Sequence, residues 1–167
     1  MAKMSADSLK NNLTNPARTY LWEVLIPNPG EGDTENYLLR AQSSEIPERG
    51  FGEINIPFKQ SAGIKFPGKI QYPQKWDVTF VESEDRQIMQ DVYDWMNNII
   101  HDRFQIGNPL IKTNIYFNLI NTDGSIAKKI KLVGTYPERM SNVAMDADSE
   151  DACKFTTTFS YDRWELV

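Results

Sequence analysis

The 167-residue sequence contains a single cysteine, Cys153, and a single histidine, His101. One cysteine excludes an intrachain disulfide and a cysteine-based zinc site. One histidine removes most metal sites and the histidine-paired nucleophiles of hydrolases. We therefore expect no cofactor and no enzyme activity of these classes.

The sequence also lacks long apolar runs and an excess of basic residues. No segment is apolar for long enough to cross a membrane, and residues 1–17 have no signal-peptide core, so we expect a soluble chain made in a reducing cytosol. The net charge of -5 makes tight binding to nucleic acid phosphates a poor fit. With 40% hydrophobic and 11% aromatic residues, the chain can form a core.

Three features were weighed as chemical sites. The acidic run over residues 146–151 lacks the central glycine and terminal glutamate of a helix-flanked calcium loop, so a solvated turn is favoured. His101, beside Asp102, falls at the end of a predicted helix, where histidine commonly complements the helix dipole. Cys153 fits a core thiol better than a nucleophile. No catalytic residue or metal ligand is predicted.

One long segment, residues 46–72, is too apolar for a solvated loop. Its two limbs alternate around a hinge at residues 60–63, with apolar positions at Ile54, Ile56 and Phe58 on one limb and Ile64, Phe66 and Ile70 on the other. This period of two indicates paired strands with one apolar face. Because a lone hairpin is marginally stable in water, we expect this projecting arm to bury its apolar face against another copy of the chain.

The remaining sequence is predicted to form one domain over residues 18–167, preceded by a flexible N-terminal arm over residues 1–17. We expect further strands at residues 18–26, 37–45, 75–81, 113–121, 125–136 and 152–166. The first has apolar residues on both faces, which indicates a central strand. A turn is expected at residues 121–124, and Pro137 is expected to begin a linking segment that extends to Asp151.

One helix is predicted over residues 84–101. Its apolar stripe recurs at three- and four-residue spacing and comprises Ile88, Val92, Trp95, Met96 and Ile99. Ser83 is the expected N-cap, and Glu84 and Asp85 would complement the positive helix end. Together these elements predict a mainly β fold: an antiparallel β-sandwich or partial barrel with one flanking helix.

Several stretches, in this order along the chain, resemble the major tail tube protein of contractile-tailed bacteriophages. They are YLLRAQSSEIP at 37–47, FPG at 66–68, WDVTF at 76–80, YDWMN at 93–97, LVGTYP at 132–137 and FTTTFSYDRW at 155–164. The single pieces are short, and their order along the chain makes the match specific.

The resemblance implies a structural virion protein assembled in the host cytoplasm. Sheets from six copies would join into a shared β-barrel around a channel, and the hexameric rings would stack into a tube through which DNA passes without specific binding. A sheath protein, a tape-measure protein and baseplate tube-initiating proteins are the implied partners. The alternatives are a type VI secretion or tailocin tube and, from another class, a monomeric ligand-binding β-sandwich.

Two groups of site residues follow from this hypothesis. The expected contacts between subunits or rings are Phe51, Ile54, Ile56, Phe58, Ile64, Phe66 and Tyr72, unless they pack on their own domain as a satellite core. The candidate channel-facing residues, on polar strand faces, are Arg40, Gln42, Ser44, Lys129 and Lys131. An acidic wall would be the simple expectation for DNA passage, so the basic residues either lie elsewhere or pair with acids from neighbouring copies.

Overall fold

The computed structural model describes residues 17–27, 40–58, 61–100, 112–143, 145, 148 and 150–167. Most of the predicted N-terminal arm, as well as His101 and Asp102, lies outside these residues. The elements are β1 (Trp22–Leu25), β2 (Ala41–Ser44), β3 (Gly50–Phe58), β4 (Ser61–Gln71), β5 (Lys75–Val81), α3 (Gln87–Ile99), β6 (Thr113–Ile120), β7 (Ile126–Met140), β8 (Lys154–Ser160) and β9 (Arg163–Leu166). The predicted fold class, mainly antiparallel β with one helix, is confirmed. No helix within these ranges is both long and apolar enough to cross a membrane.

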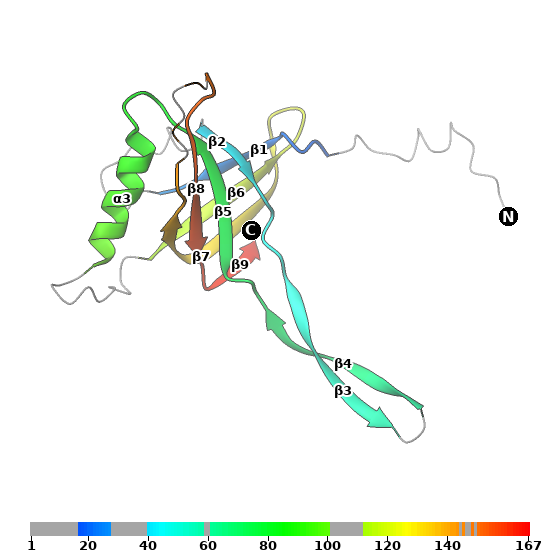
Figure 1. The fold of residues 1–167 in the computed structure, drawn as a ribbon. Coiled ribbons are helices and arrows are strands. Elements are labelled where there is room, and N and C mark those ends of the chain that lie inside the picture. Colours follow the sequence, from blue (N-terminus) through cyan, green and yellow to red (C-terminus); the bar gives the residue numbers. More distant parts are fainter. Residues whose placement is uncertain are drawn as a thin grey trace.

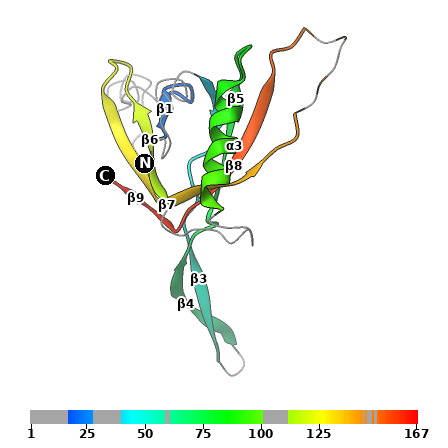
Figure 2. The ribbon, with the colours of Figure 1, turned by 90° about the vertical axis from the view of Figure 1, so that its left-hand side faces the viewer.

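The strands form one strongly bent sheet and a separate two-stranded arm, β3–β4 (Figure 1). The order in the sheet is β1-β6-β7-β8-β5-β2, with β9 also paired to β7. Because β7 pairs with β6 and β9 along its first part and with β8 along its last part, it joins two halves. We call β1, β6, β9 and the start of β7 the first half-sheet, and β2, β5, β8 and the end of β7 the second half-sheet. Turned by 90°, the two halves open as a V, with α3 lying between them (Figure 2).

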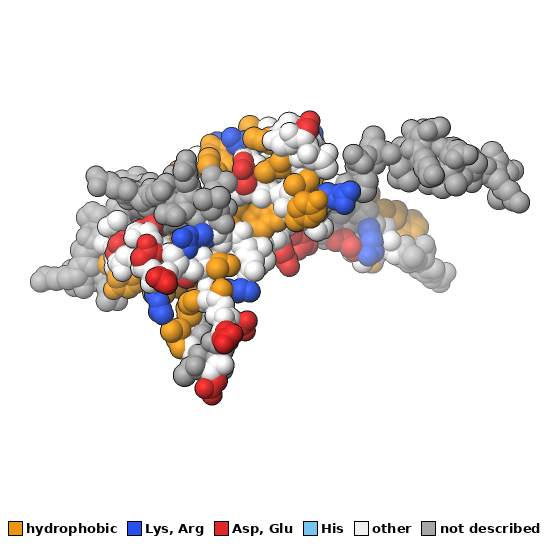
Figure 3. Space-filling model, turned by 90° about the horizontal axis from the view of Figure 1, so that it is seen from above, with side chains coloured by type: hydrophobic (Ala, Val, Ile, Leu, Met, Phe, Trp, Pro, Cys, Tyr) orange, Lys and Arg blue, Asp and Glu red, His pale blue; other side chains and the backbone are white. Residues whose placement is uncertain are grey.

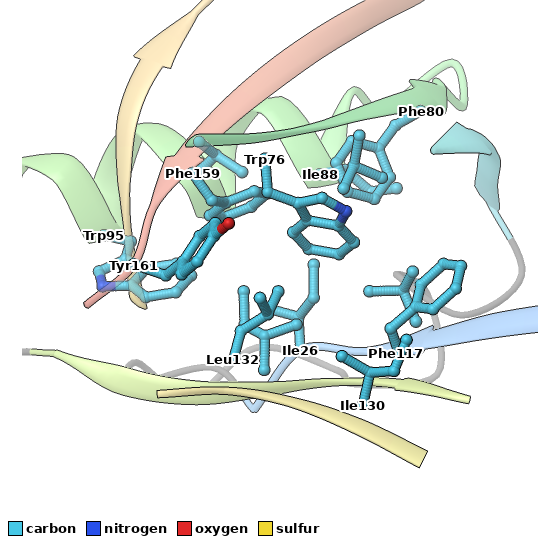
Figure 4. Close-up of a cluster of buried hydrophobic side chains, with 14 of the residues drawn as sticks. Ile26, Trp76, Phe80, Ile88, Trp95, Phe117, Ile130, Leu132, Phe159 and Tyr161 are labelled. Carbon is cyan, nitrogen blue, oxygen red and sulfur yellow. The ribbon is translucent and has the colours of Figure 1, made fainter. Parts of the chain in front are cut away.

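The core lies between the half-sheets and α3 (Figure 4). Phe159 on β8 is fully buried, and its ring centroid lies 5.8 Å from that of Trp76 on β5 and 6.0 Å from that of Trp95 on α3. From the first half-sheet, Phe117 meets Trp76 edge-on at 6.1 Å. On the helix, Ile88, Val92 and Trp95 are buried, and Met96 and Ile99 pack partly buried against the same core. The apolar stripe of the helix therefore joins the two half-sheets.

The bend in β7 centres on Gly134, which has a φ of 67°. L-residues with side chains rarely adopt this left-handed conformation. The strand then continues through Pro137 to Met140, so the prediction that Pro137 begins a linking segment is wrong. Proline is tolerated here because residues 136–140 pair only with β8 among the described strands, and the register shifts between Pro137 and Arg139.

Replacing Gly134 with alanine should destabilise the fold. The new Cβ would overlap the Asp162 carboxylate, and the positive φ would be strained. We expect a loss of about 2 kcal/mol or more in the free energy of unfolding, measured in urea. Gly50→Ala is the control, since nothing lies within 4 Å of a Cβ at that position. Equal unfolding midpoints for the two variants would contradict this account of the bend.

The helix starts later than predicted, and Ser83 is not its N-cap. Arg86 occupies the cap position with a φ of 50° and makes no side-chain cap bond, while the Ser83 hydroxyl donates to the Asp85 carboxylate within the preceding turn. No acidic residue lies in the first helical turn. Instead, Glu82 Oε1 accepts a hydrogen bond from the Met89 backbone N–H at 2.7 Å. A carboxylate directly after the end of β5 thus satisfies a free N–H of the first helical turn.

Stability should depend on the ionisation of Glu82. Burial raises the pKa of this carboxyl above its ordinary value of 4.5, and backbone hydrogen bonds from Met89 and Ser83 offset part of the rise. The folded chain therefore holds the proton more tightly than the unfolded chain. Proton binding stabilises the fold at low pH, and this contribution to the free energy of unfolding is lost as pH rises through the raised pKa. Glu82→Gln keeps the acceptor oxygen and removes the ionisation.

Urea midpoints for the wild type and Glu82→Gln should therefore diverge in favour of the variant as the pH rises above about 4.5, the ordinary pKa of this carboxyl. Glu84→Gln, at an exposed position two residues away, is the control and should follow the wild type. A difference between wild type and Glu82→Gln that does not change with pH would refute the assignment.

Two further strand predictions are corrected. The first strand is the edge strand β1 and not a central strand, since among the described strands it pairs only with β6. Val24 is fully buried, whereas Leu25 on the other face is only half-buried. The predicted final strand is divided into β8 and β9 at Tyr161 and Asp162. The Asp162 backbone N–H donates to Val133 O at 3.0 Å, which couples this break to the bend in β7.

Candidate assembly surfaces

The arm β3–β4 projects away from the sandwich in both ribbon views (Figures 1 and 2). Its strands pair antiparallel, and two apolar pairs lie directly opposite on one face, Ile54 with Phe66 and Ile56 with Ile64. Phe51 lies opposite Ile70 beyond a register shift nearer the sandwich. Residues directly opposite share a face of the hairpin. The alternation in the sequence therefore becomes a stripe of apolar cross-strand pairs.

The stripe is not covered by the rest of the described chain. Its exposed fractions run from 44% at Ile70 to 65% at Phe58, and the set comprises Phe51, Ile54, Ile56, Phe58, Ile64, Phe66 and Ile70. Tyr72, which was grouped with these residues, is only partly exposed and packs against the core. Clusters of exposed large apolar side chains mark interaction surfaces in soluble proteins.

The other face of the arm is polar. Lys65 Nζ lies 2.9 Å from Glu53 Oε1, and both side chains are mostly exposed. Nearer the sandwich the strands approach closely, since a Cβ on Gly68 would lie 2.8 Å from the carbonyl oxygen of Gly52. The arm is thus a two-faced ribbon with one face suited to water and one suited to a partner.

Two tryptophans fix the root of the arm. The segment 45–49 leads from β2 into β3, and it accepts one indole N–H from each half-sheet: Trp76 Nε1 donates to Glu45 O at 2.8 Å, and Trp164 Nε1 donates to Glu48 O at 3.0 Å. The Arg49 guanidinium also lies 6.0 Å from the Trp164 ring centre. No pattern in the sequence predicts these hydrogen bonds.

Each half-sheet has a polar outer face. On the first half-sheet, Glu23, Asn118 and Lys129 lie side by side on neighbouring strands, and Asn118 Nδ2 donates to Glu23 Oε1 at 2.7 Å. On the second, Thr79 and Thr156 are opposite each other, and their hydroxyls are 2.9 Å apart. The two faces belong to different sides of the sandwich because both inner faces meet in the core.

The candidate channel-facing residues do not share one face. Lys129 and Lys131 lie on the outer face of the first half-sheet, whereas Arg40, Gln42 and Ser44 lie at β2 in the second. A register shift between Ala41 and Ser43 disrupts the predicted alternation in β2, so Ser43 is opposite Thr79 and Ser44 is opposite the buried Val78. No pattern in the sequence predicts this bulge.

Several of the basic residues have partners within the chain. Lys129 Nζ lies 4.3 Å from the centre of the Tyr116 ring, and Lys131 Nζ lies 3.9 Å from Glu165 Oε1. On the second half-sheet, Lys75 Nζ lies 2.7 Å from Glu138 Oε1. Positive charge on either face is therefore partly balanced before any neighbouring copy is considered.

One hollow lies beside the segment that leads into the arm, and another lies nearer the turn between β6 and β7. One, of about 580 Å³, lies on the outer face of the second half-sheet and is lined by residues that include Ser43, Asp77 and Thr156. The other, of about 520 Å³, is lined mainly by apolar residues of β1, β6 and the segment after β2. Seen from above, from the side away from the arm, the molecule shows hydrophobic side chains interspersed with charged ones (Figure 3).

The described residues contain no group of three or more histidine, cysteine or acidic side chains that could hold a metal ion. Cys153 is a free, half-buried thiol beside β8. The described residues present an uncovered apolar arm, two polar sheet faces, and strand edges that have no partner among the described strands.

A family model described as phage tail tube protein matches residues 11–167. Solved structures share the fold. The sheath-tube complex of an extracellular contractile injection system (PVC) has a chain with a TM-score of 0.68 and 17% identity, covering 98% of this chain and 99% of that one. The sheath/tube terminator of the same system has a chain with a TM-score of 0.69 and 17% identity, and the match covers 93% of this chain and 99% of that one. The 6-fold symmetrised baseplate of the anti-feeding prophage has a chain with a TM-score of 0.68 and 13% identity, and the match covers 93% of this chain and 97% of that one. Among curated proteins, no sequence matches this chain.

Proposed function

Since the chain belongs to the phage tail tube protein family, we propose that its copies close into hexameric rings that stack to form the inner tube of a contractile tail. The family role is structural, and the chain performs no catalysis in this proposal. The observation that carries it is the uncovered apolar stripe of the arm, which a second copy would bury. Ring closure would also remove the exposed sheet edges.

The solved structures of this fold also support a set of partners. Chains of this fold occur in a sheath-tube complex, a tube terminator and a 6-fold symmetrised baseplate. We infer that a sheath protein surrounds this tube, that a baseplate starts it and that a tape-measure protein sets its length. Assembly takes place in the host cytoplasm, and DNA then passes through the channel. The net charge of -5 favours passage over binding, because attachment to DNA depends on cations that neutralise phosphates.

A second candidate is the tube of an injection system that delivers protein. It is favoured by the solved structures, two of which come from an extracellular contractile injection system. In both cases the chain builds a tube, and the two candidates differ only in what the channel carries. Particles isolated with DNA-filled heads would decide for the phage tail.

Negative-stain electron microscopy of the purified chain over a concentration series tests the tube itself. Rings with a central hole, or hollow tubes whose end views average to six-fold symmetry, are the expected result. Particles that stay single at every concentration, even after purified baseplates are added, would rule the tube out and favour a monomeric binding domain.

A further inference from the structure

The arm leaves the sandwich through a short root. The root consists of residues 45–49, between β2 and β3, and residues 72–74, between β4 and β5. Among the described strands, β3 and β4 pair only with each other, and in both ribbon views the arm extends away from the sandwich beyond the root (Figures 1 and 2). The bonds made at the root therefore determine the direction in which the arm points.

The break between β8 and β9 binds both segments of the root. In the first segment, Glu48 O accepts a hydrogen bond from Trp164 Nε1 at 3.0 Å. In the second, Gln74 O accepts from the Tyr161 N–H at 3.1 Å, and Gln74 Nε2 donates to Asp162 O at 3.3 Å. One short stretch thus holds the two strands of the arm where they enter and leave the sandwich. We call this stretch the clasp, residues 161–164.

The clasp is itself fixed to the first half-sheet. The Asp162 N–H donates to Val133 O at 3.0 Å, next to the bend in β7. Asp162 Oδ1 also lies 2.8 Å from Lys112 Nζ. Trp164 lies opposite Leu132 of β7 and packs partly buried against the core. Because these contacts anchor the clasp, a root that is bound to the clasp is held against the half-sheet as a whole.

The root has the composition of a rigid joint. Flexible connections are typically rich in glycine and serine, and neither segment of the root contains either residue. Each segment contains a proline instead, Pro47 or Pro73, whose ring restricts φ to about −65°. Gln74 has a φ of 59°, a conformation that residues with side chains keep only where neighbouring contacts enforce it. The two hydrogen bonds between Gln74 and the clasp are such contacts.

We propose that Trp164 and Gln74 are positioning residues, which hold the arm in one direction before a second copy binds. The consequence for assembly rests on the proposed tube function and goes beyond it, because it assigns a role to residues outside the apolar stripe. An arm that swings freely loses that freedom whenever it is bound, and a preorganised arm removes this cost from association. Trp76 makes a third contact, to Glu45 O, but it also lies in the core, so its replacement would disturb more than the root.

Pulsed electron paramagnetic resonance tests the direction of the arm in the monomer. Nitroxide labels are attached at Asn55→Cys, on the polar face of the arm, and at Lys154→Cys, on β8, in a Cys153→Ala background below the concentration at which rings form. We expect one narrow distribution of distances between the labels. Asn55 is about 20 Å from the root along β3, so a swing of ~20° would move its label by about 7 Å.

Two variants each remove one donor from the root. Gln74→Glu keeps the shape of the side chain, and Trp164→Phe keeps an aromatic ring. Both should widen the distribution of distances by about 5 Å or more. The matched controls are Gln71→Glu, which makes the same charge change on β4, and Trp22→Phe, which removes an indole that stacks on Phe117 and does not donate to the root. Both controls should keep the distribution of the parent.

Assembly of the same four variants, with the native cysteine and no label, tests the consequence for the tube. The apolar stripe is unchanged in all of them. Trp164→Phe and Gln74→Glu should raise the critical concentration for tubes about tenfold, measured by sedimentation, because the loose arm must be ordered on binding. Trp22→Phe and Gln71→Glu should assemble as the wild type does.

The two measurements separate the possible failures. A narrow distribution in both donor variants, or a broad one in the parent, overturns the positioning role. A widened distribution with an unchanged critical concentration overturns the link to assembly and leaves the tube standing. If Trp164→Phe does not fold, the exposed pair Gln74→Glu and Gln71→Glu decides the outcome. A wild-type chain that never assembles overturns the proposed tube, and the distances in the monomer still decide the positioning role.

Discussion

Chains carrying Ile56→Asp or Phe66→Asp are expected to fold normally and to form no tubes at concentrations where the wild type assembles. Both side chains lie in the middle of the apolar stripe, about half exposed and opposite apolar residues on the paired strand. Burying the exposed half of such a side chain contributes about 1 kcal/mol. An aspartate in the same place adds a desolvation cost of several kcal/mol.

A combined loss of ~4 kcal/mol lowers an association constant about 10³-fold. The effect should therefore appear as a critical concentration for tubes that moves out of the accessible range, measured by sedimentation and electron microscopy. Asn55→Asp is the matched control, because it adds the same charge at the neighbouring position, opposite Lys65, on the other face of the arm. It should assemble nearly as the wild type does.

The same two aspartate variants are also expected to keep the folding stability of the wild type. The arm pairs with itself and stands apart from the sandwich (Figure 1). The urea midpoint of the sandwich, followed by tryptophan fluorescence, should thus match the wild type. Normal tubes from both aspartate variants would show that the stripe is not an assembly surface, and unfolded variants would show that it packs on its own domain.

Phe159→Ala should produce the largest loss of stability. The side chain is fully buried and lies at the junction of both indole rings, 5.8 Å from Trp76 and 6.0 Å from Trp95. Removing a buried phenylalanine side chain lowers the free energy of unfolding by roughly 3–5 kcal/mol, because it leaves a cavity that the neighbours fill only in part. Since domains of this size are stable by about 5–15 kcal/mol, the variant should unfold at much lower urea concentration.

Thr158→Ala is the control for this substitution. Thr158 precedes Phe159 on β8 and points to the outer face, opposite Asp77. Its replacement should change the free energy of unfolding by about 0.5 kcal/mol or less. If the two alanine variants had similar midpoints, the core would not be joined through Phe159 as described.

Local pattern was enough to predict the elements whose partners are close in sequence. The arm alternates around its own turn, so Ile54 and Phe66 could be paired without knowing anything else of the fold. The turn after β6 is likewise local: the Asn121 N–H donates to Ser125 O at 2.8 Å, and the Gly124 N–H donates to Asn121 O at 3.0 Å. The stripe on α3 follows from helical spacing alone.

Features that depend on distant segments were not predictable in this way. Pro137 suggested a strand end, yet β7 continues because β8 holds it from one side only. Ser83 suggested a helix cap, but Glu82 makes that contact because the end of β5 brings it to the first helical turn. Alternation also identifies the two faces of a strand without showing on which half-sheet the strand lies. For that reason Ser44 and Lys131 were grouped, although the fold separates them.

The arm extends from one end of the molecule, and the turn between β6 and β7 marks the other (Figures 1 and 2). An arm that contacts any surface other than a neighbour's arm makes a heterologous contact, which forms a ring if its rotation closes and otherwise propagates in one direction. An arm that reaches from one ring to the next makes a contact of the second kind. A stack built this way is polar: one end displays free arms and the other displays the surfaces that receive them. A protein that starts the stack and a protein that stops it must then recognise different chemistry, and neither can take the other's place.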